Sequence, residues 1–483
     1  MTEHSHDTTP PGPTLSTDVA IIGAGTGGLR ARRAAAAAGA RALLIEGNVH
    51  GTTCARVGCM PSKLLIAAAD AAHHVRESHK FGVHAPDGPR IDGRAVLARV
   101  QRERDRFVGF VVRDVEALPP GSVLDGWARF VGPTTLQVGD LRIEAKAVVV
   151  ATGSTPFVPE PLRTLGKLLI SNEEVFELPD LPASVAVVGA GVIGLELGQA
   201  LQRLGVRVRL FAQDERLGPI SDPVVAKATR AAFSGEMTLS FFSPVQAAEV
   251  VPEGARLHWV EGGQSKEEVF ERVLVAAGRR PSVGRLGIPG LTPSPRGEIS
   301  FDSETMQAGD LPIFFAGDVV TDRALLHEAS DEGHIAGSNA AALALGRPLQ
   351  RFRRRTPLTV VFTDPQLAVV GQGFRSLALG TFAAGEVDFG DQGRSRVMGR
   401  NKGHLRVYGA VGDGRLLGAE ICGPDAEHLA HLLAWSIQSG LTVIDALRMP
   451  FYHPVVEEGL RTALRDLARQ LGLAHLPEVV SFD

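Results

Sequence analysis

Short apolar runs that lead into glycine recur along the chain, and the first of them predicts a strand–turn–helix–strand unit. Residues 18–22 (Asp-Val-Ala-Ile-Ile) are typical of a buried parallel strand, which carries apolar side chains on both faces. A glycine-rich turn at 23–28 follows, then an alanine-rich helix through Ala38 and a second strand at 42–45 that closes on Glu46. This order predicts a βαβ unit of the dinucleotide-binding type.

The glycines and the acid of this unit have different predicted roles. Gly23, Gly25 and Gly28 allow a tight turn and a close approach of the backbone to a pyrophosphate, which the helix N-terminus attracts. Glu46 is predicted to accept hydrogen bonds from the hydroxyls of the adenosine ribose. Glycines alone are a weak signal, whereas strand, helix and terminal acid together are a strong one.

The same pattern returns in the middle of the chain. An apolar run at 184–188 leads into Gly189-Ala190-Gly191-Val192-Ile193-Gly194, a helix to Leu204 and a strand at 206–211. Two units predict two dinucleotide sites, which suits electron transfer between two cofactors. One site plus a decayed duplicate is the alternative, and it is disfavoured because all three glycines persist in both copies.

The terminal acid does not return with the glycines. Glu46 lies 23 residues after Gly23, and the same spacing from Gly189 reaches Ala212. The second site is therefore expected to bind its ribose differently.

Further apolar runs outline the rest of the fold. Buried strands are predicted at 148–153, 273–281 and 313–318, with a helix from about 324 to 345. Beyond Arg351, strand-like and helix-like segments alternate, which predicts a separate α+β domain. Its expected strands lie at 359–362, 404–408 and 416–421, and its expected helices at 427–439 and 455–471.

Composition excludes several classes of function. The chain has 483 residues, of which 44% are hydrophobic and 22% charged, as expected for a globular enzyme of several domains. A net charge of −4 gives no electrostatic footprint for nucleic acid or an anionic membrane. Because no apolar stretch approaches a membrane span and residues 1–17 are polar, we expect a disordered N-terminal tail and a cytoplasmic protein. No metal site is predicted.

Two of the three cysteines stand close together. Cys54 and Cys59 lie in Gly51-Thr52-Thr53-Cys54-Ala55-Arg56-Val57-Gly58-Cys59-Met60-Pro61-Ser62-Lys63, and the third cysteine is Cys422. A pair this tight cannot join distant parts of a fold, so it indicates redox chemistry. The alternative is two buried cysteines that pack as small hydrophobic residues.

Taken together, these motifs make the chain resemble the flavin-dependent pyridine nucleotide-disulphide oxidoreductases, and within them dihydrolipoyl dehydrogenase. The resemblance runs from Asp18 to about Leu471. Its most specific parts are the thiol segment through Lys63, the second glycine unit through Gly198, Ala316-Gly317-Asp318, and His453-Pro454-Val455-Val456-Glu457-Glu458. It implies an α/β fold with two Rossmann-like dinucleotide-binding domains, for FAD and NAD(P), and a C-terminal α+β dimerisation domain.

The resemblance also implies domain boundaries and partners. The expected order is a tail at 1–17, the first part of the FAD domain at 18–153, the NAD(P) domain at 154–276, a central FAD-side region at 277–350 and the dimerisation domain at 351–483. The expected assembly is a homodimer. The expected substrate is dihydrolipoamide or lipoamide, either as a small dithiol or disulphide or on a lipoylated carrier protein supplied in trans.

By the same resemblance, individual residues receive roles. Cys59 would be the thiolate on the flavin side and Cys54 the thiol that exchanges with substrate. His453 from the partner subunit would act as the base, with Glu458 holding its imidazole. Lys63 would pair with Glu196, since a buried lysine needs a counter-charge. The expected FAD-binding residues are Gly23, Gly25, Gly28, Glu46, Thr53, Lys63, Thr152, Gly153, Arg279, Asp318 and Ala324. The expected NAD(P)-binding residues are Gly189, Gly191, Ile193, Gly194, Glu196, Ala212 and Gly278.

The chain departs from the family pattern in three places. Gly51-Thr52 replaces a Gly-Gly pair, Val455-Val456-Glu457 replaces Thr-x-Ser after His-Pro, and Ala212 replaces the acid of NAD-using members. NADP-using members place arginines just after this position, where this chain has Gln213 and Asp214, with Arg216 further on. We therefore expect NAD rather than NADP, by a small margin.

Two rival functions stay open. A glutathione-reductase-like enzyme, or another small-disulphide reductase, shares the His-Glu arrangement. A flavoprotein redox sensor without turnover is an alternative of a different class. Both thiols and His453 are present, which favours turnover.

Overall fold

The computed structural model describes residues 13–475 and residue 479 of the chain. They form two compact units, each assembled from three stretches of sequence. Unit 1 contains the stretch that ends at Gly58 together with 104–155 and 279–354, and unit 2 contains 59–103, 156–278 and the stretch from Arg355 on. The five-part division that the sequence suggests stays a prediction.

Unit 1 is centred on a five-stranded parallel sheet. Its strand order is β19-β8-β2-β3-β4. These strands are β19 (Ile313–Phe315), β8 (Ala147–Val150), β2 (Val19–Ile22), β3 (Ala42–Glu46) and β4 (Val123–Asp125). Every residue of β2, β8 and β19 is buried, so the apolar runs that predicted these three strands are confirmed.

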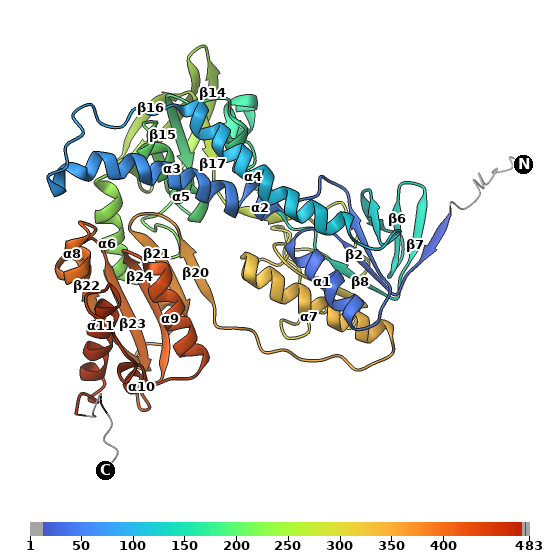
Figure 1. Cartoon of the computed structure of the whole chain (residues 1–483). Helices are drawn as coiled ribbons and strands as arrows, with labels where there is room; N and C mark the ends of the chain where they lie inside the picture. Colours follow the sequence, from blue (N-terminus) through green and yellow to red (C-terminus); the bar gives the residue numbers. More distant parts are fainter. Residues whose placement is uncertain (1–12, 476–478, 480–483) are drawn as a thin grey trace, which may run out of the picture. The chain divides into compact units, whose positions relative to one another are not determined.

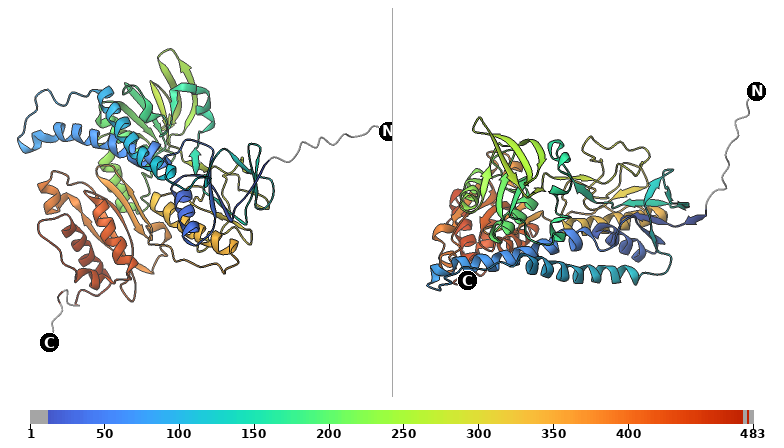
Figure 2. Two further views of the ribbon diagram at one scale, coloured as in Figure 1. Left: turned by 45° about the vertical axis from the view of Figure 1, so that its right-hand side comes forward. Right: turned by 90° about the horizontal axis from the view of Figure 1, so that it is seen from above.

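Helices α1 (Thr26–Ala37) and α7 (Leu326–Ala344) lie side by side in unit 1, as Figure 1 and Figure 2 show. Their backbones come unusually close because α7 carries glycine at two contact positions. A Cβ at Gly333 would collide with the carbonyl oxygen of Gly27, and a Cβ at Gly337 with that of Ala31. These contacts bring α7 against the first two turns of α1.

A smaller sheet in unit 1 corrects one sequence-based expectation. Residues 14–16, within the segment expected to be a disordered tail, form strand β1 (Thr14–Ser16), which pairs in parallel with β7. The pairing rests on backbone hydrogen bonds, such as Thr17 N to Glu144 O at 3.0 Å, and not on an apolar run. That is why the hydrophobic pattern gave no sign of it. Residues 1–12 lie outside the described part of the chain.

The remaining strands and helices of unit 1 are short. This sheet has the order β1-β7-β6-β5, and β9 pairs with β18 in a two-stranded sheet. Their bounds are β5 (Ala128–Phe130), β6 (Thr135–Val138), β7 (Leu141–Glu144), β9 (Ser154–Pro156), β18 (Arg279–Pro281) and α2 (Thr53–Val57).

Unit 2 contains a second five-stranded parallel sheet, which confirms the predicted repeat. Its order is β10-β17-β11-β12-β13. The strands are β10 (Leu169–Ile170), β17 (Arg272–Val275), β11 (Ser184–Val188), β12 (Arg207–Phe211) and β13 (Thr238–Ser240). The helices of this part are α3 (Cys59–Glu77), α5 (Val192–Arg203) and α6 (Pro223–Ser234), and α4 (Gly93–Glu116) also begins in unit 2.

Unit 2 also contains two antiparallel sheets. One has the order β14-β15-β16 and the other β20-β21-β24-β23-β22. Helix α9 packs on β21 and β24, and α11 on β22 and β23, so the predicted C-terminal α+β layer is confirmed. The strands are β14 (Val245–Val251), β15 (Gly254–Glu261), β16 (Gln264–Phe270), β20 (Leu358–Val361), β21 (Gln366–Gly371), β22 (Phe382–Asp388), β23 (His404–Ala410) and β24 (Leu416–Gly423). The helices are α8 (Gly393–Val397), α9 (Ala426–Gln438), α10 (Val443–Leu447) and α11 (Glu457–Gln470), and short 3-10 turns lie at Ser78–Phe81, Glu160–Leu168, Val175–Glu177, Phe374–Ser376 and Phe389–Asp391.

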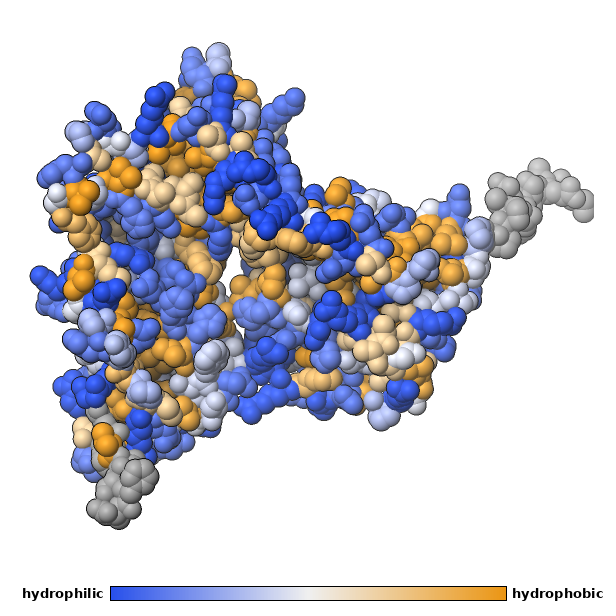
Figure 3. All heavy atoms as spheres, viewed as in Figure 1, coloured by the Kyte–Doolittle hydropathy of each residue, from blue (hydrophilic) through white to orange (hydrophobic). Residues whose placement is uncertain are grey.

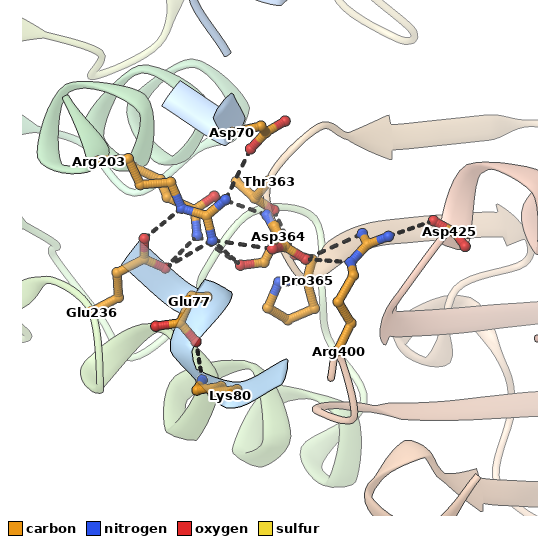
Figure 4. A network of polar contacts seen from close by, with 11 residues as sticks. Asp70, Glu77, Lys80, Arg203, Glu236, Thr363, Asp364, Pro365, Arg400 and Asp425 are labelled. Atoms are coloured by element: carbon orange, nitrogen blue, oxygen red, sulfur yellow. Dashed lines mark hydrogen bonds and ion pairs between the residues drawn. The ribbon is translucent and has the colours of Figure 1, made fainter. Parts of the chain in front are cut away.

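A buried arginine at the end of α5 joins several elements of unit 2. Figure 4 shows Arg203 between Asp70 of α3, Glu236 after α6 and Asp364 after β20. The Arg203 side chain is only 4% exposed, and its nitrogens lie 2.9 Å from Asp70 Oδ1 and 2.5 Å from Glu236 Oε1. Burial raises the pKa of Asp364, but Arg400 and Arg203 more than offset this and hold it below its usual value.

Hydrophilic side chains are interspersed with smaller hydrophobic areas on the face of the molecule that Figure 3 draws. Within residues 13–475, none of the helices combines the length and the apolar character needed to cross a membrane.

Candidate functional site

The carboxyl ends of four parallel strands meet at one edge of the unit 1 sheet. Ile22 at the end of β2 pairs with Ile45 on one side and Val150 on the other, and Val150 also pairs with Phe315. The residues that follow these strands therefore lie along one edge. Parallel sheets bind ligands outside the carboxyl ends of their strands, so this edge is the first candidate site.

The glycines after β2 shape a turn that only glycine permits. Gly23 has φ 106°, and a Cβ there would collide with the carbonyl of Ala151, while a Cβ at Gly28 would collide with the carbonyl of Gly23. Gly25 is the N-cap of α1, with no side-chain cap and open space where a Cβ would lie. The first turn of α1 thus presents backbone N–H groups to an anion such as a pyrophosphate.

Glu46 lies at the end of β3 beside this turn. Its Oε2 accepts a hydrogen bond from Ala24 N at 2.6 Å, and its Oε1 accepts one from Asn48 N at 2.9 Å. The carboxylate is held at the turn and is partly exposed, with lone pairs left for ribose hydroxyls.

The residues after β8 and β19 complete this edge. Thr152 Oγ1 is buried and has no hydrogen-bond partner among the described residues, which is costly unless a ligand supplies one. Asp318 Oδ2 lies 3.5 Å from Ser154 Oγ, which in turn accepts a 2.8 Å hydrogen bond from Arg279 Nε. Gly153 has φ 66° and open space at its Cβ position.

The thiol segment is divided between two helices. Cys54 is partly buried in α2, whose N-cap Thr52 accepts a hydrogen bond from Ala55 N at 3.3 Å. Cys59 is exposed and is the first residue of α3, a 19-residue helix. A helix N-terminus favours negative charge, which suits a residue that reacts as a thiolate.

Lys63 and Glu196 form the predicted ion pair within unit 2. Lys63 Nζ lies 2.8 Å from Glu196 Oε2 and 3.0 Å from Oε1, and the Glu196 side chain is only 5% exposed. Phe362 N donates to Glu196 Oε1 at 2.9 Å, and Lys63 Nζ lies 4.5 Å from the centre of the Phe362 ring. Such a buried carboxylate is kept only because these donors surround it.

The second glycine turn repeats the geometry of the first. Gly189 has φ 117°, and a Cβ there would collide with the carbonyl of Ala276, while a Cβ at Gly194 would collide with the carbonyl of Gly189. Gly191 is the N-cap of α5, again without a side-chain cap. This turn is the second candidate dinucleotide site.

Backbone hydrogen bonds show that Ala212 is the counterpart of Glu46. Gly23 N donates to Ile45 O at 2.7 Å, and Gly189 N donates to Phe211 O at 3.0 Å, so the next residue is Glu46 in one unit and Ala212 in the other. The Ala212 side chain is buried and offers no acceptor. The 23-residue alignment of the two units is therefore confirmed at the level of the backbone.

The acid just beyond Ala212 is already engaged. Asp214 accepts hydrogen bonds from Arg216 N at 2.9 Å and from Arg216 Nε at 2.7 Å. The side-chain hydrogen bond from Arg216 is the main reason that the pKa of Asp214 lies below its usual value.

His453 and Glu458 form the predicted pair. His453 Nδ1 lies 3.0 Å from Glu458 Oε1 and 3.1 Å from Oε2, and the His453 side chain is 81% exposed. The hydrogen bond from His453 holds the pKa of Glu458 below its usual range. An ionised Glu458 keeps the imidazole hydrogen on Nδ1 and leaves Nε2 as an acceptor on a largely exposed ring.

The other predicted residues are placed without a distinguishing contact. Thr53 is the first residue of α2, Ala324 is exposed two residues before α7, Ile193 lies in the first turn of α5, and Gly278 has φ 104° with open space at its Cβ position.

Sequence reasoning missed a buried charged cluster next to Asp318. Glu328 and Glu332 of α7 share Arg354, and Glu332 accepts a hydrogen bond from Gly317 N. Two acids four residues apart on an apolar helix indicate a buried charged site. Their partner Arg354 lies ten residues after the end of α7, however, and no local sequence pattern connects it with the acids.

Comparisons with known proteins agree with this geometry. The sequence profile described as pyridine nucleotide-disulphide oxidoreductase matches residues 17–333, and the profile of that family's dimerisation domain matches residues 358–464. Dihydrolipoyl dehydrogenase 2 of Haloarcula marismortui is 30% identical over 466 residues, which cover 93% of this chain and 96% of that protein. Dihydrolipoyl dehydrogenase of Thermus scotoductus is 30% identical over 472 residues, which cover 94% and 98%.

Solved structures share the fold. LpdA from Mycobacterium tuberculosis has a TM-score of 0.79 at 22% identity and covers 93% of this chain and 99% of its own. The Cu(II) complex of the HOCl-induced flavoprotein disulfide reductase RclA from Escherichia coli has a TM-score of 0.78 at 21% identity, with the same coverage.

Proposed function

Because the chain belongs to the pyridine nucleotide-disulphide oxidoreductases, flavoprotein enzymes that use FAD and NAD(P)(H), we propose that its substrate is the lipoyl dithiol/disulphide couple. The relatives that match almost the whole chain at 30% identity are named dihydrolipoyl dehydrogenases. The general activity, oxidoreduction of disulphides with FAD, follows from membership of the family, whereas the lipoyl substrate is our proposal.

The observation that carries the lipoyl assignment is the 30% identity to dihydrolipoyl dehydrogenases over almost the whole chain, and the His453–Glu458 pair supplies the base that this chemistry needs. A dithiol must lose protons before it can attack a disulphide, because the thiolate is the nucleophile. With its hydrogen on Nδ1, His453 can accept a substrate proton at Nε2, and Glu458, 3.0 Å from Nδ1, would stabilise the imidazolium that forms.

The thiol chemistry balances over two exchanges. One sulphur of dihydrolipoamide, deprotonated by His453, attacks Cys54 in a Cys54–Cys59 disulphide and releases Cys59 as a thiolate. The second substrate sulphur then attacks the first, which breaks the mixed disulphide and releases Cys54. The products are lipoamide, with its new S–S bond, and two reduced cysteines that hold the electron pair.

Several residues fit the FAD that the family uses. The uncapped first turn of α1 would hold the pyrophosphate, Glu46 the ribose, and Asp318 the ribityl hydroxyls. The buried, unpartnered Thr152 Oγ1 supports this fit, because a ligand there would supply its missing partner. The chemistry that FAD would supply there is the transfer of an electron pair between the thiols and a nicotinamide.

Lys63 and the second glycine turn would serve the two cofactors. By resemblance to the family, Lys63, held by Glu196, would serve the flavin, and the first turn of α5 would bind the nicotinamide dinucleotide. We propose NAD as the preferred form, because a 2′-phosphate would have to compete with Asp214 for Arg216, the first arginine after Ala212.

The chain carries the family's dimerisation domain, which supports a homodimer. We further propose that His453 acts on the thiols of the partner subunit. A lipoylated carrier protein, if used, would deliver its dithiol to that shared site.

Steady-state kinetics test the substrate. We expect turnover of dihydrolipoamide with NAD⁺ to exceed turnover of glutathione disulphide with NADH or NADPH by at least about a hundredfold in kcat/KM, and Cys54→Ser to abolish it. Faster turnover of glutathione disulphide would replace the lipoyl assignment with a small-disulphide reductase. No turnover with either couple, in protein that contains FAD, would favour a redox sensor.

A further inference from the structure

Two buried glutamates on α7 share a single arginine beneath the turn that carries Asp318. The exposed fractions of the side chains are 2% for Glu328, 1% for Glu332 and 10% for Arg354. Arg354 Nη2 lies 2.6 Å from Glu328 Oε2 and 2.8 Å from Glu332 Oε1. Arg323 adds a further charge 3.3 Å from Glu328 Oε1.

Glu332 connects this cluster to the candidate FAD site. One of its oxygens, Oε1, accepts from Arg354, and the other, Oε2, accepts a 2.8 Å hydrogen bond from the N–H of Gly317. Gly317 has φ 78°, a backbone conformation that favours glycine. The Gly317 N–H belongs to the Ala316–Gly317 peptide, so its hydrogen bond restrains the turn one residue before Asp318.

We propose that Glu332, held by Arg354, is a positioning residue that fixes the Gly317–Asp318 turn and thereby sets the affinity for FAD. The proposal rests on the proposed role of Asp318 as a ligand of the ribityl chain. The ligand concerned is the flavin dinucleotide. If the proposal holds, retention of the flavin also depends on α7 and on the segment that follows α7.

A purely structural role would explain the cluster poorly. Burial raises the pKa of Glu332 to about 7 against the opposing effects of Arg354 and the Gly317 N–H. Buried ion pairs often stabilise a fold no better than apolar residues of similar volume. In addition, the cluster fixes the Glu332 carboxylate as an acceptor for the N–H of Gly317, in the turn that precedes Asp318.

The substitution Glu332→Gln tests this acceptor directly. Both oxygens of Glu332 face N–H donors, so an amide must turn its own NH₂ toward either Arg354 or Gly317. We expect FAD to bind the apo-protein about tenfold more weakly or worse, measured by flavin fluorescence titration, because a charge-assisted hydrogen bond is lost. Arg351→Met is the matched control, since Arg351 lies three residues before Arg354 but is 66% exposed and pairs with surface acids.

A double-mutant cycle separates positioning from general destabilisation. In an Asp318→Asn background, Glu332→Gln should weaken FAD binding by less than about threefold, because the residue through which it acts is already impaired. Arg354→Lys, which retains the charge, is the second variant if Glu332→Gln does not fold. Its smaller loss of FAD affinity should vanish in the same background.

Additive effects of Glu332→Gln and Asp318→Asn would overturn the positioning role and leave Asp318 as a ligand. An unchanged FAD affinity in Asp318→Asn alone would remove the proposed role of Asp318, and the positioning proposal with it. An effect of Arg351→Met equal to that of Glu332→Gln would show that the segment acts through its general stability, and would also overturn the proposal.

Discussion

At the scale of single residues, the two βαβ units differ most at one position. The carbonyl of Ile45 accepts a hydrogen bond from Gly23 N, and the carbonyl of Phe211 accepts the equivalent bond from Gly189 N. Glu46 and Ala212, the residues that follow, therefore occupy equivalent backbone positions. Glu46 accepts from Ala24 N, whereas Ala212 leaves the corresponding Ala190 N without a carboxylate. The second site therefore lacks the acid that distinguishes a ribose from a ribose 2′-phosphate.

Replacing Ala212 with Glu should restore that acid. The new carboxylate can accept from Ala190 N as Glu46 does from Ala24 N, bind the ribose hydroxyls of NAD and repel the 2′-phosphate of NADP. A charged hydrogen bond contributes roughly 1.5–3 kcal/mol, so the ratio of kcat/KM for NADH over NADPH should rise about ten- to a hundredfold. An unchanged ratio would show that the side chain at position 212 does not face the ribose.

At the scale of secondary-structure elements, one face of α5 carries a row of polar side chains into the interior of unit 2. Glu196 binds Lys63 of α3, Gln199 binds the backbone of Asp364, and Arg203 binds Asp70, Glu236 and Asp364. This row ties the helix of the second dinucleotide turn to α3, the helix that begins at Cys59. Apolar residues of the same two helices, such as Leu65 of α3 and Leu195 of α5, belong to one hydrophobic cluster, so polar and apolar contacts both join these helices.

Truncation of Arg203 should cost far more stability than truncation of a surface arginine. Arg203→Met leaves three carboxylates without their buried partner, and breaking such a network typically costs about 3–5 kcal/mol. Arg94→Met is the matched control, because its ion pair with Asp180 is exposed on both sides and is worth at most about 1 kcal/mol. Chemical denaturation followed by circular dichroism measures both, and equal losses would contradict the account of this network.

The sequence predicted those elements whose signal is local. Glycine turns between apolar runs marked both βαβ units, and alternation of strand-like and helical segments marked the C-terminal sheet with α9 and α11. Strand β1 was not predicted, because its backbone pairing with β7 requires no pattern of apolar residues. The Arg203 and Arg354 clusters escaped because their partners lie far along the chain or beyond a turn, and only tertiary packing brings them together.

At the scale of the whole molecule, the candidate base belongs to the part of the chain that matches the dimerisation domain. His453 and Glu458 lie within residues 358–464. Trp435 and Tyr452 of the same region are 68% and 80% exposed in the single chain, an unusual state for large aromatic side chains. We expect the partner subunit to cover Trp435 and Tyr452 and to supply the thiols on which His453 acts.

Complementation between inactive variants tests that arrangement. His453→Ala and Cys54→Ser homodimers should each be inactive, whereas each heterodimer formed by subunit exchange should have about half of wild-type turnover, because one site of two is complete, and the statistical mixture about a quarter. Heterodimer formation is verified by differential tagging. No recovery in verified heterodimers would show that His453 acts within its own chain or is not the base.

Cys54 and Cys59 are expected to relay electrons between substrate and flavin, and the long-wavelength absorbance of the flavin reports on this relay. Two-electron anaerobic reduction of the wild-type protein should produce a charge-transfer band from the Cys59 thiolate to oxidised flavin. Cys54→Ser should retain a band of this kind while losing turnover, and Cys59→Ser should lack the band. A band that survives in Cys59→Ser and disappears in Cys54→Ser would reverse the two roles, and its absence from the wild-type protein would contradict the relay.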